Sequence, residues 1–253
     1  MLKQFLLIIS SLLILAALLY EFPDDFQKGW TALQRGDFEV AMQKFAPLAE
    51  QGHTNAQYNL GVMFDKGRGV SKDPLKAIKW FQLAADNGFA PAQYNLGVMY
   101  YQGRGVKKDF KLAAKWTKKA ALQDYAAAQF NLGRMHEKGV GLPQDSTSAL
   151  AWTNRAAENG HEMAQKLAVL LNVEGPEVDR DYIQALKWAL VSNVRGFKIE
   201  KDIIPLLEEK LTRKDIAKAK RSAREWLDTE KVKTENESAA KDCVVRLKIF
   251  CSF

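Results

Sequence analysis

The heptapeptide Gln57–Met63, QYNLGVM, returns as QYNLGVM at Gln93–Met99 and as QFNLGRM at Gln129–Met135, each copy 36 residues after the last. An alanine followed three residues later by a tryptophan keeps the same period, at Ala77/Trp80, Ala113/Trp116, Ala149/Trp152 and Ala185/Trp188. A period in this range is typical of stacked helical hairpins, in which each unit buries its apolar face only against its neighbours. The repeat therefore predicts an all-α solenoid, a fold that usually holds other molecules on an extended surface.

Each 36-residue unit is expected to contain two helices. Apolar residues at helical spacing predict helices over about 26–34 and 37–51, and the second helix of each unit is expected to begin near Thr54, Ala90, Ala126 and Glu162. Gly61, Gly97 and Gly133 lie inside this second helix, where a glycine costs about 1 kcal/mol relative to alanine. Because the glycine recurs at one register, we expect a neighbouring helix to come too close there for a side chain.

Turn residues recur at the same period. A left-handed glycine is expected to end the first helix of a unit at Gly52, Gly88, Gly160 and Gly196, and Asp124 replaces the glycine in one copy. The second helix is expected to end in a tight glycine loop, as at Lys66–Val70. An aspartate after each loop is expected to accept hydrogen bonds from the first turn of the next helix, at Asp73, Asp109, Asp145 and Asp181.

Beyond Gly196 the period fades. Apolar residues predict a closing helix around 203–211 and a final one around 216–226, because terminal units must end the stack with a polar face. Residues 230–241 are expected to form a flexible tail, and residues 244–250 have a composition that favours β-structure.

The formal net charge is +7, and lysine and arginine are dispersed over most of the chain. The densest basic run comprises Lys210, Arg213, Lys214, Lys218, Lys220, Arg221 and Arg224. Such a run is either a solvated helix face or a surface for an anionic partner, which could be an acidic protein, a lipid headgroup or a nucleic acid. No aromatic residue falls within the run and no nucleic-acid motif is present, so nucleic acid is not the expected partner.

No set of residues predicts a metal or cofactor site. The two cysteines, Cys243 and Cys251, form no CxxC pair and lie far from all three histidines, so no metal is expected. A disulfide between Cys243 and Cys251 is expected if the domain lies outside the cytoplasm.

No recognised motif predicts catalysis either. The segment 161–165, HEMAQ, lacks the second histidine of the zinc-protease pattern. Ser238–Lys241 matches S-x-x-K, the nucleophile motif of penicillin-recognising enzymes, but no K-T-G follows it. We therefore predict that the protein is not an enzyme.

The amino-terminal 22 residues predict a membrane segment. Phe5–Tyr20, FLLIISSLLILAALLY, carries no charge; Lys3 precedes it, and acidic residues come after it. This charge asymmetry orients the amino terminus toward the cytoplasm and the repeats across the membrane. The run is shorter than the roughly 20 residues of a full span and longer than a signal core of about 7–15 residues. Because no A-x-A cleavage pattern is present, an uncleaved anchor is expected, with a cleaved signal peptide as the alternative.

These residues resemble the Sel1-like repeats, which are relatives of the tetratricopeptide repeats. The family pattern is A-x-Y-x-L-G-x-x-Y/F, then G-x-G-V-x-x-D, then A-x-x-W-x-x-x-A. One copy carries it at Ala92, Tyr94, Leu96, Gly97, Tyr100, Gly103, Gly105, Val106, Asp109, Ala113, Trp116 and Ala120. The resemblance covers about residues 37–196 and implies a right-handed α-solenoid of helical hairpins with an adaptor or scaffold role. Some bacterial relatives are thought to neutralise delivered toxins, and a cysteine-rich subgroup binds β-lactams, although its paired cysteines are missing here.

By analogy with tetratricopeptide stacks, the QYNLG helix is expected to line a concave groove. Its groove-facing positions are predicted to bind a partner: Tyr58, Asn59, Val62, Asp65, Tyr94, Asn95, Val98, Tyr101, Phe130, Asn131, Arg134 and Glu137. Asparagines at 36-residue spacing could hydrogen-bond an extended peptide, and the aromatic residues would supply contact area. Alternatively, the asparagines pair with the next repeat or with water.

Three segments are thus predicted: a membrane anchor or signal segment at 1–22, a repeat solenoid with capping helices at 23–229, and a tail at 230–253. The expected function is a protein–protein interaction adaptor of the bacterial cell envelope. It would be held in the inner membrane by a single span with its repeats in the periplasm, or secreted to the periplasm after cleavage. A toxin-neutralising immunity protein and an envelope enzyme acting on β-lactams or peptidoglycan are the alternatives.

Overall fold

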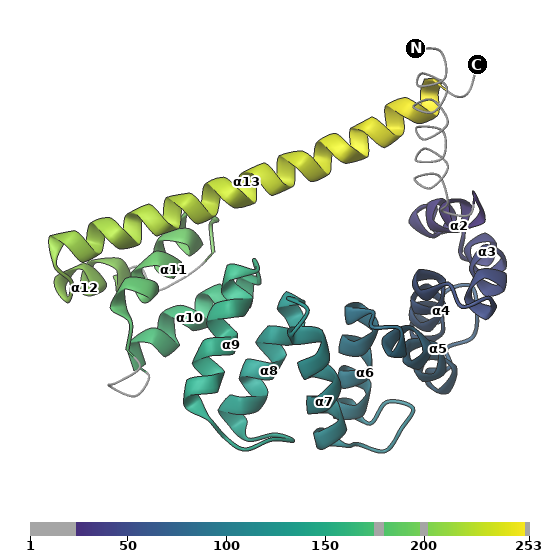
Figure 1. Ribbon diagram of the computed structural model, residues 1–253, viewed down its shortest axis with the longest axis horizontal. Helices are drawn as coiled ribbons and strands as arrows, with labels where there is room; N and C mark the ends of the chain where they lie inside the picture. The colour runs from purple at the N-terminus through teal and green to yellow at the C-terminus, as the bar shows by residue number, and fades with distance from the viewer. Residues whose placement is uncertain (1–23, 175–179, 198–201, 251–253) are drawn as a thin grey trace, which may run out of the picture. The chain divides into compact units, whose positions relative to one another are not determined.

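The computed structural model describes residues 24–174, 180–197 and 202–250, with side chains as far as residue 234. Twelve helices and no strand occupy this part of the chain (Figure 1). The helices are α2 Asp24–Arg35, α3 Phe38–Glu50, α4 Thr54–Lys66, α5 Pro74–Asp86, α6 Ala90–Gln102, α7 Phe110–Ala121, α8 Ala126–Lys138, α9 Ser146–Glu158, α10 Glu162–Glu174, α11 Tyr182–Val194, α12 Ile203–Glu209 and α13 Arg213–Phe250. They form two compact units, α2–α6 and α7–α13.

Consecutive helices pack side by side within each unit. In the first unit, α2 packs on α3, α3 on α4, α4 on α5 and α5 on α6. The second unit continues in the same way from α7 to α11, and α11 also packs against α12 and α13. The helices α4, α6, α8 and α10 begin at the residues expected from the period. The prediction of an all-α solenoid of helical hairpins is confirmed.

Predicted helix caps are present at both kinds of helix end. Asp73, Asp145 and Asp181 accept hydrogen bonds from backbone amides in the first turns of α5, α9 and α11, at 3.0–3.1 Å. At the carboxyl ends of α4 and α6, Gly67 and Gly103 adopt the left-handed conformation, with φ of 67° and 71°. These local signals set where each helix starts and stops.

Asp124 holds a conformation that glycine adopts at the equivalent positions. Its φ is 61°, and among the described residues it is the non-glycine with positive φ. A side chain makes this conformation costly unless something compensates. The Asp124 carboxylate accepts hydrogen bonds from Gln129, Arg155 and Asn159 at 3.0–3.2 Å. These bonds, above all the one from Asn159, lower the pKa of Asp124, so the ionised carboxylate links the end of α7 to α9.

The recurring glycine inside the second helix marks a close approach, as predicted. A Cβ on Gly61 would lie 2.6 Å from the ring of Phe81, which is itself fully buried on α5. A Cβ on Gly133 would lie 2.9 Å from Thr153 Oγ1 and 3.2 Å from the carbonyl oxygen of Ala149. The pairs α4/α5 and α8/α9 therefore pack more closely than any side chain at the glycine would allow.

A buried glutamine joins consecutive helices, a role that the sequence motif did not predict. Gln57, Gln93, Gln129 and Gln165 lie near the starts of α4, α6, α8 and α10 and are at most 4% exposed. Each Nε2 donates to the carbonyl oxygen eight residues earlier, at 3.1–3.2 Å. Those carbonyls lie in the last turn of the preceding helix, and each also accepts the backbone amide three residues later, at 3.0–3.2 Å. The bond thus closes the turn between two helices from the inside.

The glutamine oxygens differ in their partners. Gln129 Oε1 accepts from Asn159 at 2.8 Å, and Gln165 Oε1 accepts from Arg195 at 3.1 Å. Gln57 Oε1 is buried, and within the described part of the chain it has no hydrogen-bond partner. Gln129 and Gln165 are therefore tied to one more helix than Gln57.

The carboxyl-terminal segment differs from the expectation. Helix α13 continues without interruption to Phe250, through the residues expected to form a flexible tail and the stretch with β-favouring composition. Residues 230–241 contain neither glycine nor proline and are rich in lysine, glutamate and alanine, which favour helix. Lys233 and Glu230 also form an ion pair at 2.8 Å along the helix. Local helix propensity accounts for the difference.

Several expectations fall outside the described residues. They are the membrane segment at 1–22, Cys251, and the side chains of Ser238, Lys241 and Cys243. Across the residues that the structure describes, no helix combines the length and the apolar character needed to span a bilayer.

Replacing Gln129 with leucine is expected to lower the free energy of unfolding by about 2–3 kcal/mol, because the three hydrogen bonds of a fully buried side-chain amide are lost. The same change at Gln57 removes one bond together with an unpartnered oxygen, so the expected loss is about 1 kcal/mol or less. Urea unfolding measures both losses. The control Gln43→Leu, at an exposed site on α3, should stay within about 0.5 kcal/mol of the parent. Equal losses at Gln57 and Gln129 would contradict the role given to the glutamine oxygens.

Replacing Gly61 with alanine is expected to destabilise the protein by about 1–3 kcal/mol through overpacking, although alanine is the better helix former. Phe81→Leu should make room for the new methyl group, so the double variant should lose less stability than the two single variants summed. Thermal unfolding of the four proteins completes the cycle. Strictly additive losses would mean that the Gly61–Phe81 contact does not explain the glycine.

Candidate partner-binding site

The twelve residues predicted to bind a partner occupy equivalent positions on α4, α6 and α8. Asn59 and Asp65 are buried, Tyr101 is exposed, and the other nine are half-buried. For several of them the structure records contacts inside the repeat stack, which decide how much of each side chain a partner could reach.

Tyr58 is packed between two repeats. Its ring centroid lies 5.1 Å from that of Phe89 and 5.8 Å from that of Phe81, and the side chain of Asn95 hydrogen-bonds its phenol oxygen. Burial raises the pKa of Tyr58 above its ordinary value, and the bond with Asn95 opposes that shift. The phenol is therefore uncharged at neutral pH. The contact made by Asn95 agrees with the alternative that these asparagines pair with a neighbouring repeat.

Asn59 and Asp65 are also satisfied within the fold. Asn59 donates from its amide to the carbonyl oxygen of Asn55 at 2.8 Å, one turn earlier in α4. Asp65 pairs with Arg104 at 2.7 Å, and Lys66 lies 3.6 Å away. Arg104 belongs to the glycine loop after α6, which was predicted to be a turn alone. Breaking a buried ion pair by removing one partner destabilises a protein by about 3–5 kcal/mol. The ion pair between Asp65 and Arg104 therefore holds this loop against α4.

The equivalent residues of α8 make a third set of contacts. Arg134 and Glu137 form an ion pair at 2.9 Å, and Phe130 stacks on His161 with ring centroids 4.5 Å apart. His161 Nδ1 accepts a hydrogen bond from the amide of Ala164 at 3.2 Å, in the first turn of α10. Burial lowers the pKa of His161, which keeps this nitrogen able to accept. The histidine of the incomplete zinc-protease pattern is thus a helix cap, and no cluster of three potential metal ligands occurs among the described residues.

A hollow of about 350 Å³, here called the aromatic hollow, lies beside Tyr58 in the first unit. Four aromatic side chains and three carboxamides line it: Phe26, Trp30, Tyr58, Phe89, Gln27, Asn55 and Asn59. Helix α2 supplies the first pair of aromatic residues, α4 supplies Tyr58, and Phe89 stands just before α6. The hollow therefore brings two predicted residues, Tyr58 and Asn59, together with an aromatic pair from another helix.

Trp30 lines the aromatic hollow but is not among the residues predicted to bind a partner. Its spacing from Phe26 on α2 is typical of the apolar face of a helix, yet its side chain is 39% exposed. Phe26 by contrast stacks on His53 at 4.8 Å and packs on Phe45 at 5.5 Å. A large apolar side chain left in water beside a hollow is a common feature of binding sites.

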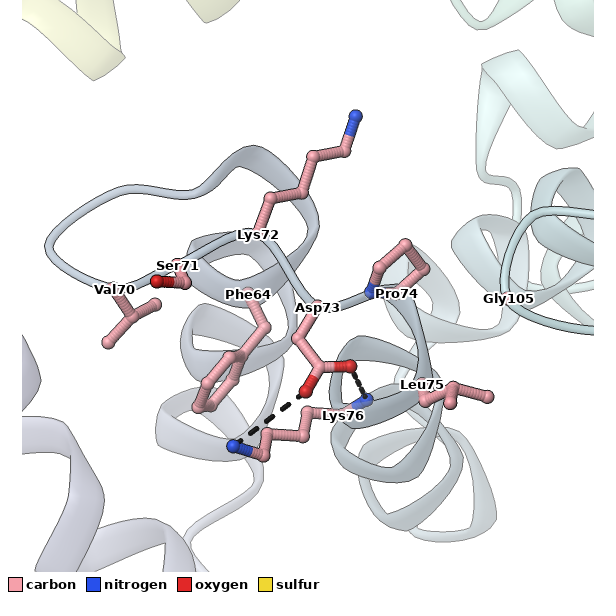
Figure 2. A pocket seen from close by; sticks show the side chains of 9 residues that line it. All are labelled: Phe64, Val70, Ser71, Lys72, Asp73, Pro74, Leu75, Lys76 and Gly105. Carbon is pink, nitrogen blue, oxygen red and sulfur yellow. Dashed lines mark hydrogen bonds and ion pairs between the residues drawn. The ribbon is translucent and has the colours of Figure 1, made fainter.

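A second hollow, of about 550 Å³, lies at the loop between α4 and α5 (Figure 2). Figure 2 shows Asp73 facing Lys76: one carboxylate oxygen accepts from the Lys76 backbone amide at 3.0 Å, and the other lies 3.7 Å from its Nζ. The same ammonium lies 5.4 Å from the ring centroid of Phe64. These charged groups serve as the cap of α5 and hold each other, so we assign this hollow a structural role.

A third hollow, of about 370 Å³, lies between α9, α11 and α13 in the second unit. Its buried ammonium, Lys187, pairs with Glu158, and Trp226 Nε1 donates to the backbone carbonyl oxygen of Glu158 at 3.0 Å. Here too the charged groups are engaged with one another. The aromatic hollow alone of these three combines an exposed aromatic ring with an uncharged lining.

Comparison with known proteins identifies the repeat. Sel1 repeats match residues 54–89, 90–125, 126–161 and 162–190, together more than half of the chain. The fold is similar to that of a protective antigen present in uropathogenic Escherichia coli strains, whose crystal structure displays an SLR fold. The two sequences are 32% identical and the TM-score is 0.64; the match covers 81% of this chain and 45% of the antigen chain. The fold is also similar to a Sel1 repeat protein from Oxalobacter formigenes, with 26% identity and a TM-score of 0.62 over 81% and 96% of the two chains.

A curated relative matches over a shorter segment. DAP3-binding cell death enhancer 1 of Mus musculus is 38% identical over 50 residues, which are 20% of this chain and 10% of that protein. The match thus spans a tenth of this relative, and the chain covers less than half of the Escherichia coli antigen. The similarity to both concerns the repeats and not the whole proteins.

Sel1 repeats generally mediate protein–protein interaction, and proteins built from them are generally non-catalytic scaffolds. The glycine loops, the aspartate caps and the Ala-x-x-Trp helices recur here within the four matched segments. The chain belongs to the Sel1 repeat family.

Proposed function

We propose that this chain is a protein-binding adaptor of the bacterial cell envelope, whose partner inserts an uncharged, apolar side chain into the aromatic hollow. The observation behind the proposal is the exposed ring of Trp30 beside a hollow that also contains Tyr58 and Asn59. The general role of Sel1 repeats in protein–protein interaction supports the choice of a protein partner.

The lining of the aromatic hollow restricts what it can bind. Tyr58 is its one titratable lining residue, and burial keeps that phenol neutral. A charged side chain would lose its hydration in the hollow and find no opposite charge, which is unfavourable. Aliphatic and aromatic side chains would instead bury apolar area against Phe26, Trp30 and Phe89.

Carboxamides at the rim supply a second kind of contact. Within the described part of the chain, the side-chain amides of Gln27 and Asn55 have no hydrogen-bond partner. An amide both donates and accepts, so each of these side chains can pair with a peptide group of the partner's backbone. The arrangement suits a peptide segment that inserts one side chain and runs past the amides.

The envelope location is supported by the sequence. The uncharged run Phe5–Tyr20 lies between Lys3 and acidic residues, a charge distribution that favours export of the repeats on its carboxyl-terminal side. Aromatic and amide contacts of the kind described would work equally in the periplasm, because they do not depend on redox state.

Trp30→Ala is expected to weaken partner binding by at least about 30-fold, since exposed tryptophans beside hollows often act as binding hot spots worth about 2 kcal/mol or more. The full-length chain, cross-linked in cells and purified, would identify the partner, and titration of the purified pair would give the dissociation constant. The matched control is Leu75→Ala, which removes another exposed apolar side chain of the same unit, at the second hollow. Equal binding by the parent and both variants would rule out the aromatic hollow as the site.

Deleting residues 5–20 is expected to move the protein from the membrane fraction, where it should resist extraction with salt, to the soluble fraction. Cell fractionation with immunoblotting measures the shift, and the amino-terminal sequence of the mature protein distinguishes an anchor from a cleaved signal. A full-length chain that stays in the cytoplasmic fraction would contradict the envelope location.

A further inference from the structure

The outward face of the first three turns of α13 is basic. Five exposed cations lie on this side of the helix, away from the repeats. They are Arg213, Lys214, Lys218, Arg221 and Arg224. The acidic residue within this stretch, Asp215, points to the inner side and pairs with Thr212 at 2.6 Å in the cap of the helix. Successive residues rise by about 1.5 Å, so the five cations, here called the basic face, form a strip about 17 Å long.

The cations of the basic face are available to a partner. Lys220, their neighbour on α13, pairs with Glu208 of α12 at 2.7 Å, and Lys210 lies 5.8 Å from the ring centroid of Tyr182. Among the described residues, none forms an ion pair or hydrogen bond with the five cations of the basic face. Five positive charges therefore lie close together and form no ion pair among the described residues, with the exposed Glu225 following at the end of the strip; a cluster of this kind attracts a negatively charged surface.

Packing fixes the direction in which the basic face points. The opposite side of α13 buries Ala219, Ala223 and Trp226 against the core of the second unit. The Trp226 ring meets Trp188 of α11 edge-on, with centroids 5.7 Å apart, and α13 lies against α11 (Figure 1). Because these contacts prevent the helix from turning about its axis, the cations form a preorganised strip.

We propose that the basic face of α13 docks the second unit onto the surface of a membrane that contains anionic phospholipids. The phosphate groups of such lipids are the chemistry that lysine and arginine recognise best. The membrane tether proposed above would keep the chain at a membrane, which raises the effective concentration of lipid. The inference rests on the membrane tether proposed above but not on the aromatic hollow.

The composition of the basic face favours lipid over the other anionic partners. Protein interfaces have an apolar centre rich in tyrosine, tryptophan and methionine, whereas the exposed uncharged residue among these cations is Ala217. Surfaces that bind single-stranded nucleic acid add aromatic side chains on which bases stack, and the basic face has none. A lipid surface requires only charge and an unobstructed helix side.

The test compares lysine reactivity in two membranes. Full-length protein is reconstituted in nanodiscs of phosphatidylcholine, alone or with about 30% phosphatidylglycerol, acetylated briefly with an amine-reactive ester and mapped by mass spectrometry. Lys214 and Lys218 should be acetylated at least about threefold more slowly in the anionic discs than in the neutral ones. Adding about 0.5 M sodium chloride should remove this difference in rate. Lys79 and Lys107, which are exposed elsewhere on the chain, serve as internal references and should react equally in both.

Two triple variants distinguish the basic face from net charge. Arg213, Arg221 and Arg224 changed together to glutamine should abolish the protection of Lys214 and Lys218. The matched control changes the exposed Lys111, Lys115 and Lys138 to glutamine and should leave the protection intact.

Three results would overturn the proposal. They are equal reactivity of Lys214 and Lys218 in both discs, protection that survives the arginine triple variant, and protection that appears only when a DNA duplex or poly-glutamate is added to neutral discs. The last result would assign the basic face to a nucleic acid or an acidic protein. Because Trp30→Ala should not change lysine protection, failure here is distinguishable from failure of the partner-binding proposal.

Discussion

The repeat stack depends on one buried hydrogen bond made four times. At the turns that precede α4, α6, α8 and α10, a glutamine donates to the carbonyl oxygen eight residues earlier, in the last turn of the preceding helix. Because an unpaired buried polar group is costly, the position of this glutamine constrains the turn and the start of the next helix together. The absence of a side chain at Gly61 and Gly133 then allows the following helix to pack closely against each of them.

These constraints decide which surfaces are left for other molecules. Some side chains of the second helices that were predicted to bind a partner also make contacts between repeats: Tyr58 with Asn95, Asp65 with Arg104, and Phe130 with His161. Trp30 on α2 and the basic face on α13 lie on helices outside the matched repeats. Both proposals therefore concern helices at the margins of the repeat array, where there is no further repeat to pack against.

Much of the fold could be predicted because its signals are local. A glycine or aspartate at a helix end acts through its own backbone and the nearest amides, so Gly67 and Asp73 could be assigned from their positions in the period. The candidate site could be predicted only in part. Tyr58 and Asn59 do line the aromatic hollow, but Trp30 looks like a core residue in sequence, because helical spacing shows which face a residue is on and not whether that face is covered.

The sequence by itself determined the period, the starts of the repeat helices and the caps at their ends, and with them the solenoid, because each of these depends on residues within a few positions of one another. Only the tertiary structure decided which polar side chains are used up inside the stack and which remain exposed. Gln57 and Gln129 illustrate the reason: they occupy the same motif position, yet the oxygen of Gln129 meets Asn159 and that of Gln57 meets no partner among the described residues. Such a pairing depends on whether packing brings a polar residue, here 30 positions away in sequence, next to the glutamine. The motif itself does not contain that information.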